Sequence, residues 1–306
     1  MTKGLISLVA LLVGLLALPA CAEPLEAVAS FSILGDLVER IGGQRVRVHA
    51  LVGPNADAHV YSPTPADARR LARAKVVIVN GLGFEGWIDR LVRSAGYRGE
   101  VVVASRGITP LPTSGQADRH APGRRDAHAH AEGVDPHAWQ DLRNAKHYVR
   151  NIARALATID PAGKGEYEGN ASRLIDEIDA LDTEIRRQLD ALPPERRTVV
   201  SSHDAFAYFA EAYHVRFRSP TGFSTDAEPS AAGVAALIRQ IKRERIQAVF
   251  MENISDPRLV EQIRAETGVR IGGTLYSDAL SPTDGPAASY LAMMRHNARV
   301  LLEALR

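Results

Sequence analysis

A long amphipathic stretch from residue 160 to residue 192 constrains the fold more than any other part of the chain. Asp160 and Pro161 form a helix cap followed by a proline at the first helical position, and Pro193 and Pro194 prevent a helix from continuing. Between these limits an apolar side chain recurs every three or four residues: Tyr167, Ala171, Leu174, Ile178, Leu181, Ile185, Leu189 and Leu192. A helix of this length would measure about 48 Å. Since that exceeds the width of a small domain, we expect it to join two lobes.

The same apolar stripe also fits a heptad repeat, so a coiled coil is the competing interpretation. Only about four heptads fit into the stretch. Gly163, Gly165 and Gly169 also weaken its first turns. We therefore favour a single strut that packs against the rest of its own chain.

Runs of β-branched residues alternate with helical patterns on both sides of the strut. They lie at residues 25–30, 46–52, 76–80 and 100–104 before it, and at 198–202, 215–218, 248–251 and 269–272 after it. Such alternation is typical of parallel sheets covered by helices. We predict an α/β fold with two lobes, each built on a four-stranded, mostly parallel sheet. The N-terminal lobe covers 23–140, the connecting helices 141–192 and the C-terminal lobe 193–306.

The first 22 residues have the pattern of an export signal. An apolar run at 5–18 follows a basic residue and ends at small residues, which fits cleavage after Ala22. The same segment resembles a lipoprotein box ending in Cys21, although Pro19 disturbs that box. We predict a soluble periplasmic protein, with lipid attachment at Cys21 as the alternative.

Cysteine content and charge limit the possible chemistry. Cys21 is the only cysteine, so the mature lobes contain neither a disulfide nor a thiolate metal ligand. Any metal must be bound by histidines and carboxylates. The formal net charge of +1 gives no sign of a nucleic-acid partner.

Polar residues suited to metal binding fall in loops that follow predicted strands or precede the connecting helices. They are His59, His137, His203 and Asp278. Ligands of parallel α/β proteins collect at the carboxyl ends of strands. Three imidazoles and one carboxylate form a four-coordinate set that suits Zn²⁺. The alternative is that each is an ordinary solvated loop residue. Glu252 and Asn253, also at a strand end, are candidates for orienting a ligand.

The stretch 105–133 has the composition of a mobile loop, since it is rich in polar residues, proline and glycine. It contains three histidines, His120, His128 and His130, for which we consider metal capture and plain solvation as alternatives. His128 and His130 form an H-x-H pair, as some dinuclear hydrolases do. The other residues of such a motif are missing, and no H-E-x-x-H occurs.

Four segments in order resemble one known family. They are His59-Val60-Tyr61-Ser62-Pro63-Thr64-Pro65, Asp135-Pro136-His137-Ala138-Trp139, Ser202-His203-Asp204-Ala205-Phe206-Ala207-Tyr208-Phe209 and Leu275-Tyr276-Ser277-Asp278. They closely resemble motifs of the cluster A-I substrate-binding proteins of zinc and manganese ABC transporters, and the chain looks most like the periplasmic zinc-binding branch.

That resemblance implies two (β/α)₄ lobes joined by a rigid backbone helix, with one metal ion between them. It implies the ligands His59, His137, His203 and Asp278, and delivery to an ABC membrane permease with a cytoplasmic ATPase. Zinc-binding relatives carry a His-rich insertion at this place for metal capture, but the loop here is short and only modestly rich in histidine, so both alternatives stay open. Family members that bind manganese generally carry a carboxylate at position 203. His203 therefore favours Zn²⁺ over Mn²⁺.

We accordingly predict a high-affinity zinc-binding protein that is monomeric and is not an enzyme, because four protein ligands leave no open position on the metal. A manganese-binding member of the same family is the first alternative. A secreted zinc metallohydrolase is the second, and an adhesin or metallochaperone of the same fold is a third. A periplasmic zinc metallochaperone is a further candidate partner.

Overall fold

The computed structural model describes residues 23–113, 133–220, 222, 224–226 and 229–306. The predicted export signal and the candidate metal-capture residues His120, His128 and His130 lie outside these ranges. Within the described ranges, no helix combines the length and the apolar character needed to cross a membrane.

The N-terminal lobe is built on one parallel sheet. Its strands are β1 (Leu25–Phe31), β2 (Val46–Val52), β3 (Val76–Val79) and β4 (Glu100–Val103), in the order β2-β1-β3-β4. Its helices are α1 (Ser32–Gly42), α2 (Pro65–Arg73) and α3 (Ile88–Ser94). A capping box between Thr64 and Asp67 begins α2, as expected from Thr64, Pro65 and Asp67 in the sequence.

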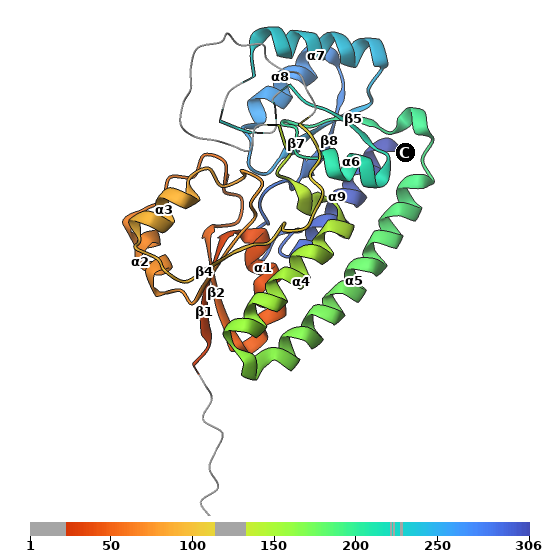
Figure 1. Cartoon of the computed structure of the whole chain (residues 1–306). Coiled ribbons are helices and arrows are strands. Elements are labelled where there is room, and N and C mark those ends of the chain that lie inside the picture. The colour runs from red at the N-terminus through yellow and green to blue at the C-terminus, as the bar shows by residue number, and fades with distance from the viewer. Residues whose placement is uncertain (1–22, 114–132, 221, 223, 227–228) are drawn as a thin grey trace, which may run out of the picture.

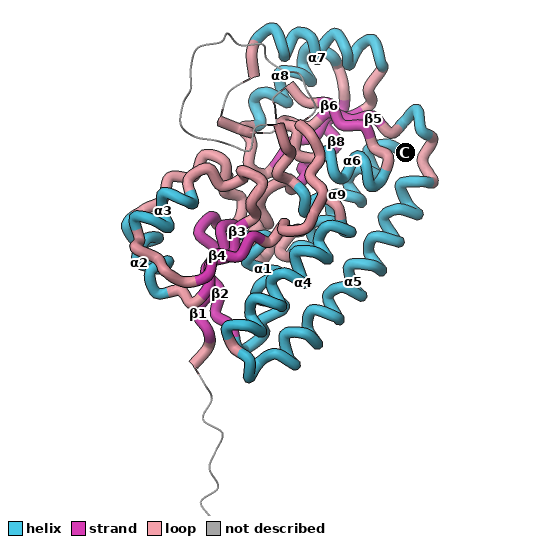
Figure 2. The backbone as a smooth tube through the Cα atoms, in the orientation of Figure 1, coloured by secondary structure: helices cyan, strands magenta, loops and turns pink. Residues whose placement is uncertain are grey.

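The C-terminal lobe repeats this plan. Its strands are β5 (Thr198–Val200), β6 (Arg216–Arg218), β7 (Ala248–Glu252) and β8 (Arg270–Leu275), in the order β6-β5-β7-β8. All pairs are parallel. Its helices are α6 (Ala207–Tyr213), α7 (Ala231–Glu244), α8 (Pro257–Thr267) and α9 (Tyr290–Leu305). Figure 2 shows the two sheets on opposite sides of a central region made of loops. The predicted two-lobed α/β fold is confirmed.

Helices α4 (Leu142–Ile159) and α5 (Lys164–Asp190) connect the lobes. The expected helix at 160–192 is shorter than predicted at both ends. Asp160 does act as a cap, but its side chain accepts from Gly163 N at 3.3 Å and caps the 3₁₀ turn Pro161–Gly163, so the α-helix begins only at Lys164. With 27 residues α5 is about 40 Å long.

The apolar stripe of α5 is buried within the chain itself. It packs against α1 of the first lobe, α6 of the second, and α4 and α9. This arrangement agrees with the strut and not with the coiled coil. Figure 1 shows α5 running past both lobes along one side of the molecule.

The last helix returns to the first lobe. α9 packs against α1 and α5 as well as against β8 of its own lobe. The N–H of Tyr290, in its first turn, donates to Asp36 Oδ2 on α1 at 2.9 Å. One hydrophobic core therefore runs through both lobes.

A second, smaller core lies beneath α7 and α8, and we call it the outer cluster. Its buried members are Val200, Val234, Leu237, Ile238, Ile241, Ile246, Val249, Val260, Ile263 and Val269. On β7, Val249 belongs to the outer cluster, whereas Ala248 and Phe250 belong to the main core. This division follows the alternation of side chains along a strand.

Asp36 makes the contact between α1 and α9 sensitive to pH. Burial raises the pKa of Asp36 to about 6, although the hydrogen bond from Tyr290 N and the charge of Arg40 oppose that rise. The folded chain thus binds a proton more tightly than the unfolded chain, so the stability contributed here falls as the pH rises from about 4 through 6.

We predict that Asp36→Asn stabilises the metal-free protein by about 1–2 kcal/mol at pH 7.5 and by much less at pH 4. Urea denaturation at both pH values measures this. Asp176→Asn on the exposed side of α5 is the control and should change neither value. Destabilisation by Asp36→Asn at pH 7.5 would contradict the prediction.

Candidate metal centre

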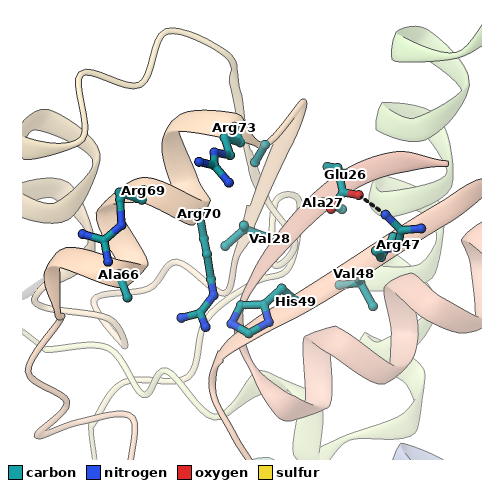
Figure 3. Close-up of a pocket in the computed structure, with 11 residues that line it drawn as sticks. Glu26, Ala27, Val28, Arg47, Val48, His49, Ala66, Arg69, Arg70 and Arg73 are labelled. Carbon is teal, nitrogen blue, oxygen red and sulfur yellow. Dashed lines mark hydrogen bonds and ion pairs between the residues drawn. The ribbon is translucent and has the colours of Figure 1, made fainter. Parts of the chain in front are cut away.

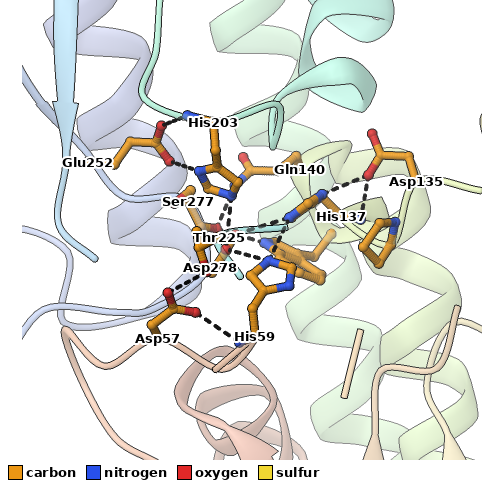
Figure 4. A network of polar contacts seen from close by, with 12 residues as sticks. Asp57, His59, Asp135, His137, Gln140, His203, Thr225, Glu252, Ser277 and Asp278 are labelled. Carbon is orange, nitrogen blue, oxygen red and sulfur yellow. Dashed lines mark hydrogen bonds and ion pairs between the residues drawn. The ribbon is translucent and has the colours of Figure 1, made fainter. Parts of the chain in front are cut away.

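The structure brings together the four candidate ligands from four separate loops. His59 follows β2, His203 follows β5 and Asp278 follows β8, while His137 directly precedes the 3₁₀ turn Ala138–Gln140. One donor atom from each lies within 4.8 Å of the donors of all the others. Figure 4 shows the three imidazole rings directed toward the carboxylate of Asp278. In the described part of the chain, this is the one such group of His, Cys, Asp or Glu side chains.

The spacing of the donors fits a single small cation. Asp278 Oδ2 lies 3.2 Å from His59 Nε2 and 3.2 Å from His203 Nε2. His137 Nε2 lies 3.4 Å from His59 Nε2 and 3.6 Å from Asp278 Oδ1. Ligands at zinc distances around a tetrahedral ion are separated by about 3.3 Å. The side chains can therefore hold such an ion with little movement.

Two of the rings are oriented by carboxylates behind them. Asp135 Oδ1 lies 2.7 Å from His137 Nδ1 and also accepts from His137 N at 2.8 Å. Glu252 Oε2 lies 2.7 Å from His203 Nδ1, and Glu252 Oε1 accepts from the N–H groups of Ser202 and His203. Each contact directs Nε2 of the ring toward the centre and increases the basicity of that nitrogen.

The sequence analysis identified Glu252 as an orienting residue but assigned no role to Asp135. Its position two residues before His137 was the available signal. Asn253, the other candidate, donates to Asn55 Oδ1 and Ala279 O, so it contacts a neighbour of Asp278 and not a ligand.

The loop that carries Asp278 is anchored to residues outside its own lobe. Trp139 Nε1 and Gln140 Nε2 both donate to the carbonyl oxygen of Ser277, at 2.9 and 2.7 Å. Further along the loop, Leu280 N donates to Ser32 Oγ at 3.0 Å, and Leu280 O accepts from Asn55 N at 2.9 Å. Asp278 thus belongs to the C-terminal lobe, but the loop that carries it is also bound directly to the N-terminal lobe.

The site is closed to bulk water. The side chain of His59 is 4% exposed and that of Asp278 is fully buried. Phe84 contacts the rings of His59 and His137 and forms an apolar wall. Beside His59, Asp57 links the two lobes, since it accepts from His59 N at 2.8 Å and from Thr225 Oγ1 at 2.6 Å.

The charges in this enclosed space are strongly coupled. Burial alone lowers the pKa of His137, but the carboxylates of Asp278 and Asp135 outweigh it and raise that pKa to about 9. Burial is likewise outweighed at His203, where Glu252 and Asp278 raise the pKa well above its ordinary value. Burial would raise the pKa of Asp278, yet His137 and His203 hold it well below its usual range. Without a metal, protonated rings therefore balance the carboxylate.

Comparison with known proteins places the chain in a family. The profile described as "Zinc-uptake complex component A periplasmic" matches residues 27–304. A manganese-binding lipoprotein of Halalkalibacterium halodurans is 32% identical over 283 residues, covering 92% of this chain and 89% of the relative. An iron-binding protein of Yersinia pestis is 32% identical over 273 residues, covering 89% of this chain and 84% of the relative.

Solved structures agree with this assignment. The periplasmic zinc-binding protein of Treponema pallidum matches with a TM-score of 0.82 and 28% identity, covering 92% of this chain and 99% of that one. A manganese-bound mutant of a periplasmic metal-binding protein from Candidatus Liberibacter asiaticus matches with a TM-score of 0.81 and 29% identity. The match covers 92% of this chain and 100% of that one. This chain therefore belongs to the periplasmic zinc-uptake component A family, the cluster A-I substrate-binding proteins of metal ABC transporters.

Proposed function

We propose that this protein binds one Zn²⁺ ion through His59, His137, His203 and Asp278 and delivers it to an ABC importer. The observation that carries the proposal is the buried set of three imidazoles and one carboxylate, whose donor spacing fits a tetrahedral ion. Nitrogen-rich sites favour zinc over manganese, which prefers oxygen ligands.

Manganese is the second candidate. Relatives that match almost the whole chain are named as manganese-binding, and another is named as iron-binding. His203 separates the candidates, because a carboxylate there would make the site richer in oxygen and better suited to Mn²⁺.

The site supports transport without chemistry on the ion. Four protein donors fill a tetrahedral shell, whereas catalytic zinc sites keep a position for water. Displacing Asp278 would open such a position, but its fully buried carboxylate is held among the three rings. We therefore propose a carrier in preference to a metallohydrolase.

Membership of the family implies a permease and an ATPase as partners. Several relatives are named as lipoproteins. Their names support export followed by lipid attachment at Cys21, in place of the soluble product that we first expected. The periplasmic metallochaperone and the monomeric state remain predictions from the sequence, and the comparisons lend the metallochaperone no support.

Metal content tests the identity of the ion. Protein purified without added metal should contain about one zinc per chain. His203→Glu should shift the preference toward manganese, and Asp278→Ala should abolish tight binding. His214→Ala, outside the site, is the control. Elemental analysis and competition between the two metals measure these results. Wild-type protein that retains manganese in the presence of equal free zinc would overturn the zinc assignment.

Proton release tests the charge balance of the site. Because the pKa of His137 is about 9 and that of His203 is also raised, an incoming cation must displace protons from the rings. We expect about one or two protons to be released per ion at pH 7, and affinity to decrease from pH 8 to pH 6. Calorimetry in buffers of different ionisation enthalpy measures both quantities. An affinity that does not depend on pH would contradict the displacement of protons from the two rings by the metal ion.

Glu252 should increase the affinity for zinc indirectly, because its carboxylate orients the ring of His203 and makes Nε2 of that ring more basic. Glu252→Gln keeps the size of the side chain but removes its charge. We expect zinc affinity to fall by about 10–100-fold and the pKa of His203 to decrease in the metal-free protein. Metal titration and NMR of the imidazole measure these effects. Glu261→Gln on the surface of α8 is the control, and an unchanged pKa of His203 would count against this role.

A further inference from the structure

A groove in the N-terminal lobe lies apart from the metal centre. It has a volume of about 620 Å³ and is formed by α2 and by the amino-terminal halves of β1 and β2. The metal ligands, by contrast, follow the carboxyl ends of strands. Figure 3 shows the side chains that line the groove.

The groove exists because β2 is an edge strand that is only partly covered on one face. On the other face α1 packs closely, since a side-chain carbon at Gly35 would lie 3.3 Å from Ala50 Cβ. The open face carries Arg47 and His49, which pair in register with Glu26 and Val28 of β1. Neighbouring residues of paired parallel strands project to the same side of a sheet.

Helix α2 provides the opposite wall with one of its faces. The lining positions are Ala66, Arg69, Arg70, Arg73 and Ala74, which recur at helical spacing. The groove therefore contains four arginines and one histidine against a single carboxylate, Glu26. Its floor includes the apolar side chains of Val28, Ala66 and Ala74.

Only part of this positive charge is neutralised by the protein. Arg47 pairs with Glu26 at 2.6 Å, and Arg70 pairs with Asp67 at 3.2 Å. Among the residues that the structure describes, the side chains of Arg69 and Arg73 have no ion pair or hydrogen bond. Burial and then the charge of Arg70 lower the pKa of His49, which is consistent with a positive potential inside the groove.

We propose that this groove binds a phosphate group, carried either by a soluble molecule or by a lipid headgroup. Guanidinium groups bind phosphate oxygens through paired hydrogen bonds, and several of them together match the charge of a dianion better than that of a monocarboxylate. The volume lies within the range of small-molecule sites. Arg69 and Arg73 supply the free donors, and Arg70 and His49 also line the groove.

Titration of the full metal-free protein with inorganic pyrophosphate tests the proposal. We expect saturable binding that weakens with salt, and amide NMR shifts that cluster on α2 and β2. Arg69→Gln/Arg73→Gln should weaken binding at least about tenfold. The control Arg90→Gln/Arg93→Gln removes the same charge from the exposed side of α3 and should bind like the wild type.

Two further arms identify the source of the phosphate. Binding to vesicles that contain phosphatidic acid, a phosphate monoester, but not to phosphatidylcholine vesicles, lost in the Arg69/Arg73 variant, would indicate a lipid headgroup. Pyrophosphate binding without vesicle binding would indicate a soluble ligand. Succinate, a dicarboxylate, should bind more weakly than pyrophosphate. The proposal is overturned if neither phosphate probe binds saturably, if both double variants lose equal affinity, if succinate binds as well as pyrophosphate, or if the NMR shifts cluster around His137 and His203.

Discussion

The buried carboxylate of Asp278 is the constraint on which the site depends. A fully enclosed negative charge is costly unless a positive charge lies beside it. In the metal-free protein the rings of His137 and His203 provide that charge by holding protons, with Asp135 and Glu252 behind them. A divalent cation can take over the same task. Protons and a metal ion therefore compete for one position.

A rigid frame keeps the donors in place. α5 spans both lobes, α9 returns from the second lobe to α1, and a single hydrophobic core joins the two lobes. Large hinge motion would break this core. The Asp278 loop, in contrast, joins the first lobe through hydrogen bonds to the Ser277 carbonyl and to Leu280 N. We therefore expect release of the ion to begin with a local movement near Asp278 and not with separation of the lobes.

The sequence predicted most of the sheet positions and the loops of the four candidate ligands that converge, because strand periodicity and strand-end loops are local features. Asp135 was missed, since its contact with His137 requires a tight turn that the spacing alone does not specify. The donation of Trp139 and Gln140 to Ser277 could not be predicted, because those residues are separated by more than 130 positions and meet only when the lobes pack. The arginines of α2 have the spacing of any solvated helix face. Only the open face of β2 makes them the wall of a groove.

The outer cluster beneath α7 and α8 gives the second lobe a second, smaller core. Its apolar residues are separate from the main core that supports His203 and Asp278. Regions with their own small core open more readily than the rest of a domain. Local opening is therefore expected to begin in this outer layer, so the exposed faces of α7 and α8 are natural places to attach a reporter or an affinity tag.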